Sequence, residues 1–177
     1  MPFLEYLVRM EKDTTITILG MPGVGKSTVG RLAAERLGIE FLDGDLLIRE
    51  GEGRSHGEIL REIGREAFLD LECRYVLEVG GEACIYAPGG SVVYRWAAIE
   101  HLRRLGPVVV LRLGLEELTE RIGDLRARGV VLREGQTLAD LYAERMPLYE
   151  RAATIFVDAS GESAEAVADR LLAAIGC

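Results

Sequence analysis

Short apolar runs alternate with longer segments of helical periodicity along most of the chain. The apolar runs are rich in β-branched and aliphatic residues and end at glycine or acidic residues, which predicts strands. The predicted strands are residues 14–19, 39–45, 82–90, 106–113 and 154–159. Apolar residues three and four positions apart predict helices at 26–37, within 45–80, and at 94–105, 115–125, 137–153 and 163–176. Strands that alternate with helices indicate an α/β fold, in which helices cover both faces of a parallel sheet.

Three interruptions modify this pattern. The glycine-rich stretch 51–57 is expected to break the helical region 45–80, and Pro147 lies inside the penultimate predicted helix. Residues 126–136 are charged and interrupted by glycine, so we expect a mobile loop there. No linker, repeat or low-complexity segment divides the sequence, so residues 1–177 are predicted to form one domain.

A glycine-rich segment joins the first predicted strand to the first predicted helix. Residues 20–27 read GMPGVGKS, which fits the pattern G-x-x-x-x-G-K-[ST]. A chance glycine-rich turn would give the same letters, but the position between a strand and a helix favours a phosphate cradle. Glycines let backbone N–H groups approach phosphate oxygens, and the helix N-terminus directs its positive dipole end at the anion.

Two side chains of this segment have distinct expected roles in binding ATP. Lys26 reaches the β- and γ-phosphates as a positive charge, and Ser27 offers its hydroxyl to Mg²⁺. The expected nucleotide contacts here are Gly23, Val24, Gly25, Lys26, Ser27 and Thr28. The sequence therefore predicts a protein that binds ATP together with magnesium.

The composition narrows the choice of partners. Hydrophobic residues make up 49% of the 177 residues and charged residues 28%, which is typical of a globular protein. The formal net charge is −8 and there is no basic cluster, so nucleic acid and anionic membranes are not expected partners. A small-molecule partner remains, and we expect a monomer or weak dimer; the resemblance described below implies that the small molecule carries a hydroxyl group.

The cysteines and the N-terminal segment bear on the compartment. Cys73 and Cys84 lie in apolar patterns, which favours buried free thiols in a reducing environment. The N-terminal segment lacks the basic start and long apolar run of a signal peptide, and no apolar run reaches membrane-spanning length. We therefore expect a cytoplasmic protein.

Several motifs follow one another in an order that resembles the shikimate kinase family. After the cradle come FLDGD at 41–45, PGG at 88–90 and ERMPLY at 144–149, and the resemblance covers nearly the whole chain. It implies a three-layer P-loop kinase fold, with a five-stranded parallel sheet in the order 2-3-1-4-5 flanked by helices. It also implies a substrate-binding helical region at about 45–80, a lid at about 123–137, and phosphorylation of shikimate by ATP.

Matching these motifs residue by residue implies further roles. Asp43 corresponds to the family aspartate that orders a water on Mg²⁺, and Asp45 to the one that binds the acceptor hydroxyl and is the candidate base. A carboxylate at the end of a strand, beside the γ-phosphate, can orient a hydroxyl for attack. Arg145 matches the arginine that holds the substrate carboxylate, and Arg121 matches the arginine that packs on the adenine.

Two arginines compete for the role of the lid arginine that the resemblance implies. This residue would stabilise charge on the transferring phosphoryl group. Arg128 is favoured, because RGVVL aligns with the family lid motif R-P-L-L without a gap. Arg133 is the alternative.

The chain departs from the family pattern at the acceptor site. Leu69 stands where the family carries an arginine that grips the shikimate carboxylate, and a leucine cannot make that charge-assisted contact. Pro88 replaces the first of three family glycines. Gly89 and Gly90 remain, and they still permit close approach of the backbone to the substrate.

Arg65 offers one compensation for this loss. It lies four residues before Leu69 and so falls on the same helix face. We hypothesise that Arg65 and Arg145 together hold the acid group of the acceptor; the alternative is that Arg65 is a solvated surface residue. With this clamp the acceptor is a hydroxylated acid of shikimate-like size, and shikimate is favoured. In the other interpretation the missing arginine indicates a different small alcohol, such as a polyol, an amino alcohol or another hydroxy acid.

Two other functions compete with a small-molecule kinase. A nucleoside monophosphate kinase would use the same cradle but needs an acceptor site that reads a base, usually with several arginines. A nucleotide-binding regulatory protein would transfer nothing and would need no second pocket. Asp45, Arg145 and an arginine-bearing lid argue against the regulator.

Overall fold

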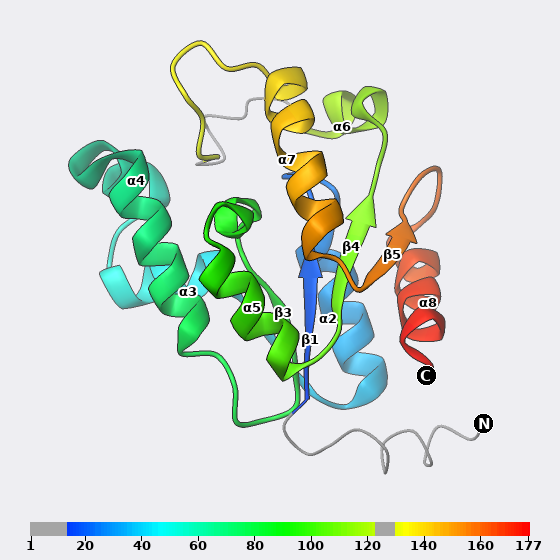
Figure 1. Ribbon diagram of the computed structural model, residues 1–177. Helices are drawn as coiled ribbons and strands as arrows, with labels where there is room; N and C mark the ends of the chain where they lie inside the picture. The colour runs from blue at the N-terminus through cyan, green and yellow to red at the C-terminus, as the bar shows by residue number, and fades with distance from the viewer. Residues whose placement is uncertain (1–13, 123–129) are drawn as a thin grey trace.

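Five parallel strands form the centre of the molecule (Figure 1). The computed structural model describes residues 14–122 and 130–177. The strands are β1 (Thr15–Leu19), β2 (Glu40–Asp43), β3 (Cys84–Ala87), β4 (Val108–Arg112) and β5 (Ile155–Asp158). Their order is β2-β3-β1-β4-β5, and every neighbouring pair is parallel. The predicted order 2-3-1-4-5 is therefore confirmed.

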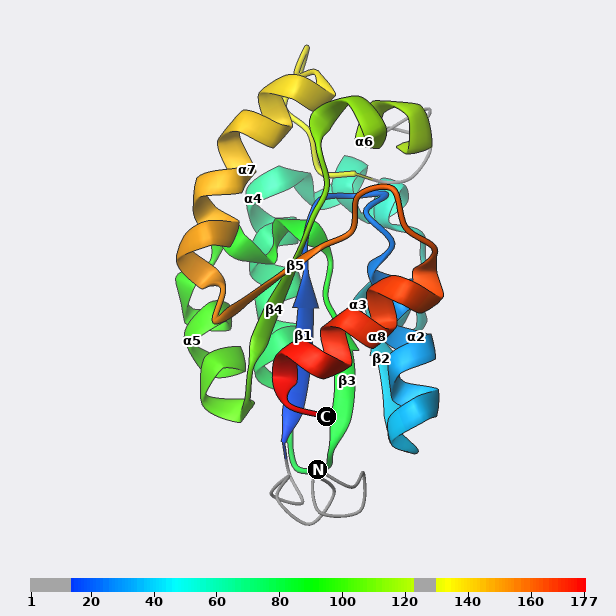
Figure 2. The ribbon, with the colours of Figure 1, turned by 90° about the vertical axis from the view of Figure 1, so that its right-hand side faces the viewer.

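Helices cover both faces of this sheet, as the alternating pattern predicted. They are α2 (Lys26–Leu37), α3 (Gly44–Glu52), α4 (His56–Leu77), α5 (Trp96–Leu105), α6 (Leu115–Ile122), α7 (Leu138–Ala152) and α8 (Ala164–Ile175), with a 3-10 helix η1 (Gly90–Tyr94). Figure 2 shows α2 and α8 on one side of the sheet and α5 and α7 on the other. The result is the three-layer arrangement that the sequence predicted.

The middle strand, β1, shows why this sequence forms a sheet that is covered by helices on both faces. All five residues of β1 are buried, including Thr15 and Thr17. The strand pairs with β3 on one side and with β4 on the other, so its backbone groups are satisfied within the sheet. Its β-branched side chains pack against helices on both faces, which explains why apolar residues do not alternate with polar ones here.

The helical region after β2 is broken within the glycine-rich stretch 51–57, as the sequence predicted. Gly53 ends α3 in the left-handed conformation at φ 66°. Ser55 then starts α4 with a capping box, in which its side chain accepts from the backbone of Glu58 and the Glu58 side chain accepts in return. A second interruption at Gly64, with φ 78°, bends α4 and was not predicted.

Several other expectations can be compared with the described residues. The last predicted helix, the helix containing Pro147, and the one starting at Leu115 are all present. Residues 130–136 form a loop without helix or strand, and the rest of the predicted mobile loop lies outside the described residues. Cys84 is buried and Cys73 is half-buried, and both are free thiols. Within the described ranges, no helix is long and apolar enough to cross a membrane.

Candidate active site

The glycine-rich segment forms a tight loop between β1 and α2, at the carboxyl edge of the sheet. Gly23 has φ 79°, and a Cβ there would collide with Ile122 of α6. Gly25 has φ 103° and is the N-cap of α2. Both positions therefore require glycine, because the backbone is left-handed. The geometry presents the N-terminus of α2 as a binding place for an anion.

Lys26 lies at the first position of α2 and points back over the loop. Its Nζ donates to the carbonyl oxygens of Gly20 at 3.0 Å and Met21 at 3.2 Å. Desolvation of the ammonium group lowers the pKa of Lys26 to about 8, although Asp45 and Asp43 oppose the shift. A phosphate brought to this position would restore the charge of the ammonium group.

We expect nucleotide binding to take up a proton at alkaline pH. With a pKa of about 8, the neutral fraction of Lys26 rises from about a tenth at pH 7 to about three quarters at pH 8.5. Phosphate raises the pKa, so the uptake on binding Mg-ATP should grow over that range. Titration calorimetry in two buffers of different ionisation enthalpy measures it. An uptake that stays constant or falls with pH would contradict this assignment.

Two aspartates lie where β2 passes into α3. Asp43 is the N-cap of α3, and its Oδ1 accepts from the backbone nitrogens of Asp45 at 3.1 Å and Leu46 at 3.2 Å. Its Oδ2 accepts from the Ser27 hydroxyl at 2.9 Å. The Asp43 carboxylate therefore connects the end of β2 to the phosphate cradle by its hydrogen bond with the Ser27 hydroxyl.

Gly44, between the two aspartates, fixes where Asp45 lies. A Cβ at Gly44 would be 2.8 Å from the Cα of Pro88 and 2.9 Å from the Tyr86 hydroxyl, so the turn after β3 leaves no room for a side chain. The close approach brings Asp45 beside Gly89, whose hypothetical Cβ would lie 2.8 Å from the Asp45 Oδ1. The Asp45 side chain is 62% exposed, with His56 Nδ1 3.8 Å away.

A single cavity of about 510 Å³ joins the cradle to the aspartates and continues beyond them. Its lining includes the predicted residues Gly23, Gly25, Lys26, Ser27, Thr28, Asp43, Asp45, Gly89, Gly90, Arg121 and Arg145. Val24 is buried and is not part of this lining. The structure thus brings most of the predicted site residues together around one space, although they come from five separate segments of the chain.

Arg145 of α7 is 1% exposed and borders the cavity. Its Nε donates to the Tyr94 hydroxyl at 3.2 Å, and its Nη2 donates to the Val131 carbonyl at 3.2 Å. A Cβ at Gly90 would lie 2.9 Å from its Nη1. The guanidinium group is therefore held on two sides, and the glycine leaves space beside it.

Tyr94 orients Arg145, and a Tyr94→Phe substitution tests this. The ring lies 5.3 Å from the Arg145 guanidinium carbon, and the hydroxyl accepts from its Nε. Phenylalanine keeps the ring but removes the acceptor, which typically costs about 1–3 kcal/mol. We expect acceptor KM to rise roughly tenfold while kcat changes less. Tyr142→Phe is the matched control, because the Tyr142 hydroxyl donates to the Leu113 carbonyl at 3.3 Å and does not border the cavity. An unchanged KM would contradict the role of Tyr94.

Leu69 and Arg65 lie apart from the cavity lining. Leu69 is 1% exposed and belongs to a small apolar cluster with Ile48, Ile59, Phe68, Leu71 and Val131. The Arg65 guanidinium carbon lies 4.8 Å from the Tyr94 ring, and the side chain pairs with Glu66 and approaches Glu144 at 3.9 Å. Both Arg65 and Arg145 thus contact Tyr94, but only Arg145 borders the cavity. The hypothesis of a two-arginine clamp stays a prediction that these contacts do not support.

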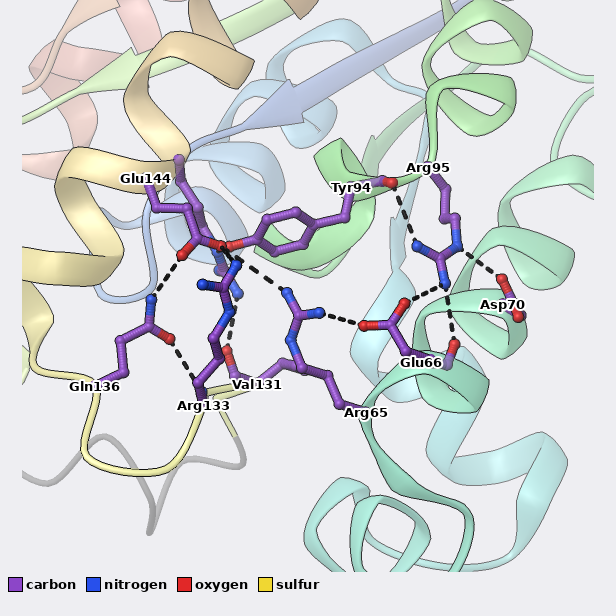
Figure 3. A network of polar contacts seen from close by, with 10 residues as sticks. Arg65, Glu66, Asp70, Tyr94, Arg95, Val131, Arg133, Gln136 and Glu144 are labelled. Atoms are coloured by element: carbon purple, nitrogen blue, oxygen red, sulfur yellow. Dashed lines mark hydrogen bonds and ion pairs between the residues drawn. The ribbon is translucent and has the colours of Figure 1, made fainter.

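Figure 3 shows how the loop after residue 129 is attached to its surroundings. Glu144 of α7 accepts from Gln136 at 2.9 Å and pairs with Arg133 at 3.3 Å. Arg133 is therefore directed to α7 and is not part of the cavity lining. Arg128, the favoured lid arginine, lies outside the described residues. Arg121 borders the cavity and pairs with Glu117 one turn earlier.

Sequence reasoning assigned no role to Glu72, Ser91 or Tyr94. Glu72 is 2% exposed, borders the cavity, and accepts from the Ser91 hydroxyl at 2.6 Å. Burial, reinforced by Asp45, raises the pKa of Glu72 to about 7. The available signal was the family motif F-R-x-x-E, which Phe68 and Glu72 match while Leu69 stands in place of the arginine. No comparable signal marked Ser91 or Tyr94.

The sheet order, the cradle at the start of α2 and the polar cavity beside it define a P-loop kinase of small molecules. The family model of shikimate kinase matches residues 22–176. The chain belongs to the shikimate kinase family.

Individual relatives agree with this. The shikimate kinase of Gloeobacter violaceus is 38% identical over 159 residues, which cover 86% of this chain and 87% of the relative. The structure of shikimate kinase from Acinetobacter baumannii in complex with shikimate superposes with a TM-score of 0.83 at 30% identity, covering 94% of each chain. A relative of another name, threonine synthase-like 1 of Macaca fascicularis, is 33% identical over 92% of this chain but only 22% of its own length.

Proposed function

We propose that this protein transfers the γ-phosphate of ATP to a hydroxyl group of shikimate. The observation that carries this proposal is that Lys26, Asp45 and Arg145 line one cavity together. Such a space can hold a nucleotide tail and an acidic alcohol side by side. Family membership supports shikimate as the alcohol and ATP as the phosphate donor.

The chemistry follows from the positions of three charged groups. Lys26 and the N-terminus of α2 hold the terminal phosphates and stabilise the charge that develops on them. Arg145 holds the carboxylate of the acceptor, so that a hydroxyl reaches Asp45. The hydroxyl oxygen forms a bond to the γ-phosphorus, the bridging bond to the β-phosphate breaks, and Asp45 accepts the hydroxyl proton. The products are ADP and the phosphate ester.

The oxygen groups beside the cradle fit a magnesium ion. The Ser27 hydroxyl and the Asp43 carboxylate lie 2.9 Å apart and supply the hard oxygen ligands that Mg²⁺ prefers. Ser27 would hold the ion and Asp43 would orient its water. When bound, the ion supplies positive charge that neutralises the phosphate oxygens.

Further properties belong to the same proposal. We infer one kinase domain over the whole chain, with an acceptor-binding region at about 45–80 and a lid at about 123–137. Arg121 is the proposed adenine contact, and Arg128 or Arg133 the lid arginine. The net charge of −8 supports a small-molecule partner without nucleic acid or membrane. A cytoplasmic monomer or weak dimer is part of the same proposal.

An ADP-release assay with a panel of acceptors tests the proposed function. Shikimate, quinate, gluconate and nucleoside monophosphates are offered with Mg-ATP, and the product is identified by mass. We expect shikimate to accelerate ADP release well above the rate with ATP alone. Acceleration by nucleoside monophosphates alone, or the same rate with and without any acceptor, would contradict the proposal.

A further inference from the structure

Two carboxylates border the same small space at the acceptor end of the cavity. A Cβ placed at Gly89 would lie 2.8 Å from the Asp45 Oδ1 and would clash with the Glu72 Oε1. Asp45 comes from α3 and Glu72 from α4, so separate elements bring the two groups to one point. Transfer to a hydroxyl needs one such carboxylate as its base, and the mechanism above assigns no task to Glu72.

Among the described residues Glu72 forms no ion pair within 4 Å, although Lys26 and Arg145 lie near enough to act on its charge. Its Oε2 accepts from the Ser91 hydroxyl at 2.6 Å, and none of the ion pairs in those residues includes it. The nearest turn of the same helix toward its N-terminus carries Leu69, which is 1% exposed in an apolar cluster. A carboxylate that is 2% exposed and has no directly paired cation is costly to keep ionised.

The opposite charge lies one residue further along the same turn. A Cβ placed at Gly90 would lie 2.9 Å from Arg145 Nη1. The guanidinium group thus borders Gly90, whereas the two carboxylates border the preceding residue, Gly89. Consecutive residues are about 3.8 Å apart along the backbone. An α-amino acid carries its ammonium and carboxylate groups on one carbon, so it offers charges of both signs to groups that flank adjacent residues of one turn.

We propose that this site has a further activity, the phosphorylation of a small hydroxylated α-amino acid whose ammonium group contacts Glu72 and whose carboxylate contacts Arg145. The proposal rests on the proposed kinase function, because it uses the same nucleotide site and the same Asp45. The side-chain hydroxyl oxygen bonds to the γ-phosphorus, the β–γ bridging bond breaks, and Asp45 accepts the proton. The products are ADP and an O-phospho amino acid.

Three matched compounds test the ammonium and carboxylate contacts separately. Homoserine carries both charged groups, 4-hydroxybutyrate lacks the ammonium group, and 3-aminopropanol lacks the carboxylate. A site that pairs a charged group discriminates strongly against an analogue without it. We expect kcat/KM for homoserine to exceed that of each analogue roughly 100-fold, with the phosphorylated product identified by mass. Equal use of homoserine and 4-hydroxybutyrate would overturn the proposal.

The Glu72→Gln variant shows whether Glu72 is responsible. Glutamine keeps the shape and can still bond Ser91, but it has no charge. The preference for homoserine over 4-hydroxybutyrate should fall from roughly 100-fold to a few-fold, while Glu62→Gln on the exposed part of α4 keeps it. Melting temperature and ATP affinity show that the variant is folded. An undiminished preference in folded Glu72→Gln would overturn the assignment.

The pH dependence gives a second readout. Glu72 is faced by Asp45 from α3, Lys26 from α2, Arg145 and Tyr149 from α7, and Tyr86 from β3. Burial raises its pKa to about 7, so its ionised fraction increases between pH 6 and pH 8. The homoserine preference should therefore increase over this range and should be flat in Glu72→Gln. A preference that falls with pH in the unmodified protein would contradict an ionised Glu72.

Failure of this inference differs from failure of the proposed function. If the protein phosphorylates shikimate but does not phosphorylate homoserine, the inference is overturned and the proposed function stands. If the protein binds ATP but neither shikimate nor any of the three compounds increases ADP release, both are overturned.

Discussion

Replacing Asp45 by asparagine is expected to lower kcat for shikimate about a thousandfold, within the range of 10²–10⁴ typical of a lost general base. Asp45 lies beside Gly89 at the mouth of the turn after β3, and it borders the cavity that also contains Lys26. Asparagine keeps the size and the backbone cap of Asp43 but cannot accept the hydroxyl proton. Steady-state kinetics with saturating Mg-ATP measure the effect.

The comparison variant for this prediction is Asp169→Asn. Asp169 is an exposed aspartate of α8 that pairs with Arg36 at 2.6 Å, far from the cavity lining. It should leave kcat unchanged, and Asp45→Asn should retain affinity for ATP. A loss of less than tenfold in Asp45→Asn would show that another group positions and deprotonates the hydroxyl.

A Lys26→Met variant is expected to lose about a thousandfold in kcat. A preorganised positive charge beside the transferring phosphate typically contributes a factor of about 10²–10³ or more to the rate. The fold should not lose stability. Desolvation lowers the folded pKa of Lys26 to about 8, below that of an exposed lysine, so below pH 8 the folded protein carries a charge that its surroundings disfavour. Methionine removes that charge, and the melting temperature at pH 7 should stay the same or rise.

Arg31→Met is the counterpart for Lys26→Met. Arg31 is exposed on α2, about one turn beyond Lys26, and its guanidinium carbon lies 5.2 Å from the Phe41 ring. This change should leave kcat within a few-fold of the original. If Lys26→Met retained activity while its ATP affinity stayed high, the cradle would not act as assigned.

The fold followed from the sequence because local patterns and global topology agree. The apolar run of β1 and the helix of α2 are joined by a loop whose glycines adopt left-handed angles, which is visible in the letters alone. The bend at Gly64 was missed, because an isolated glycine in a helical pattern is usually tolerated there. Its left-handed φ depends on packing that periodicity does not describe.

The acceptor site was only partly predictable. Asp45 and Arg145 were found through motifs, and the structure places both at the cavity. The surroundings of Arg145 depend on Tyr94 and Val131, which are distant in sequence and carry no motif. The i, i+4 spacing of Arg65 and Leu69 was real, but the Arg65 side chain turns to Tyr94 and Glu66. Spacing fixes a helix face and does not fix where a long side chain ends.

The most direct test of the central claim is a crystal structure with magnesium, a non-hydrolysable ATP analogue and shikimate. The account predicts the terminal phosphates against Lys26 and the N-terminus of α2, the shikimate carboxylate on Arg145, and one shikimate hydroxyl within hydrogen-bond distance of Asp45 and directed at the γ-phosphorus. Phosphates bound elsewhere, or an Asp45 that contacts neither the shikimate nor the space beside the γ-phosphate, would contradict it.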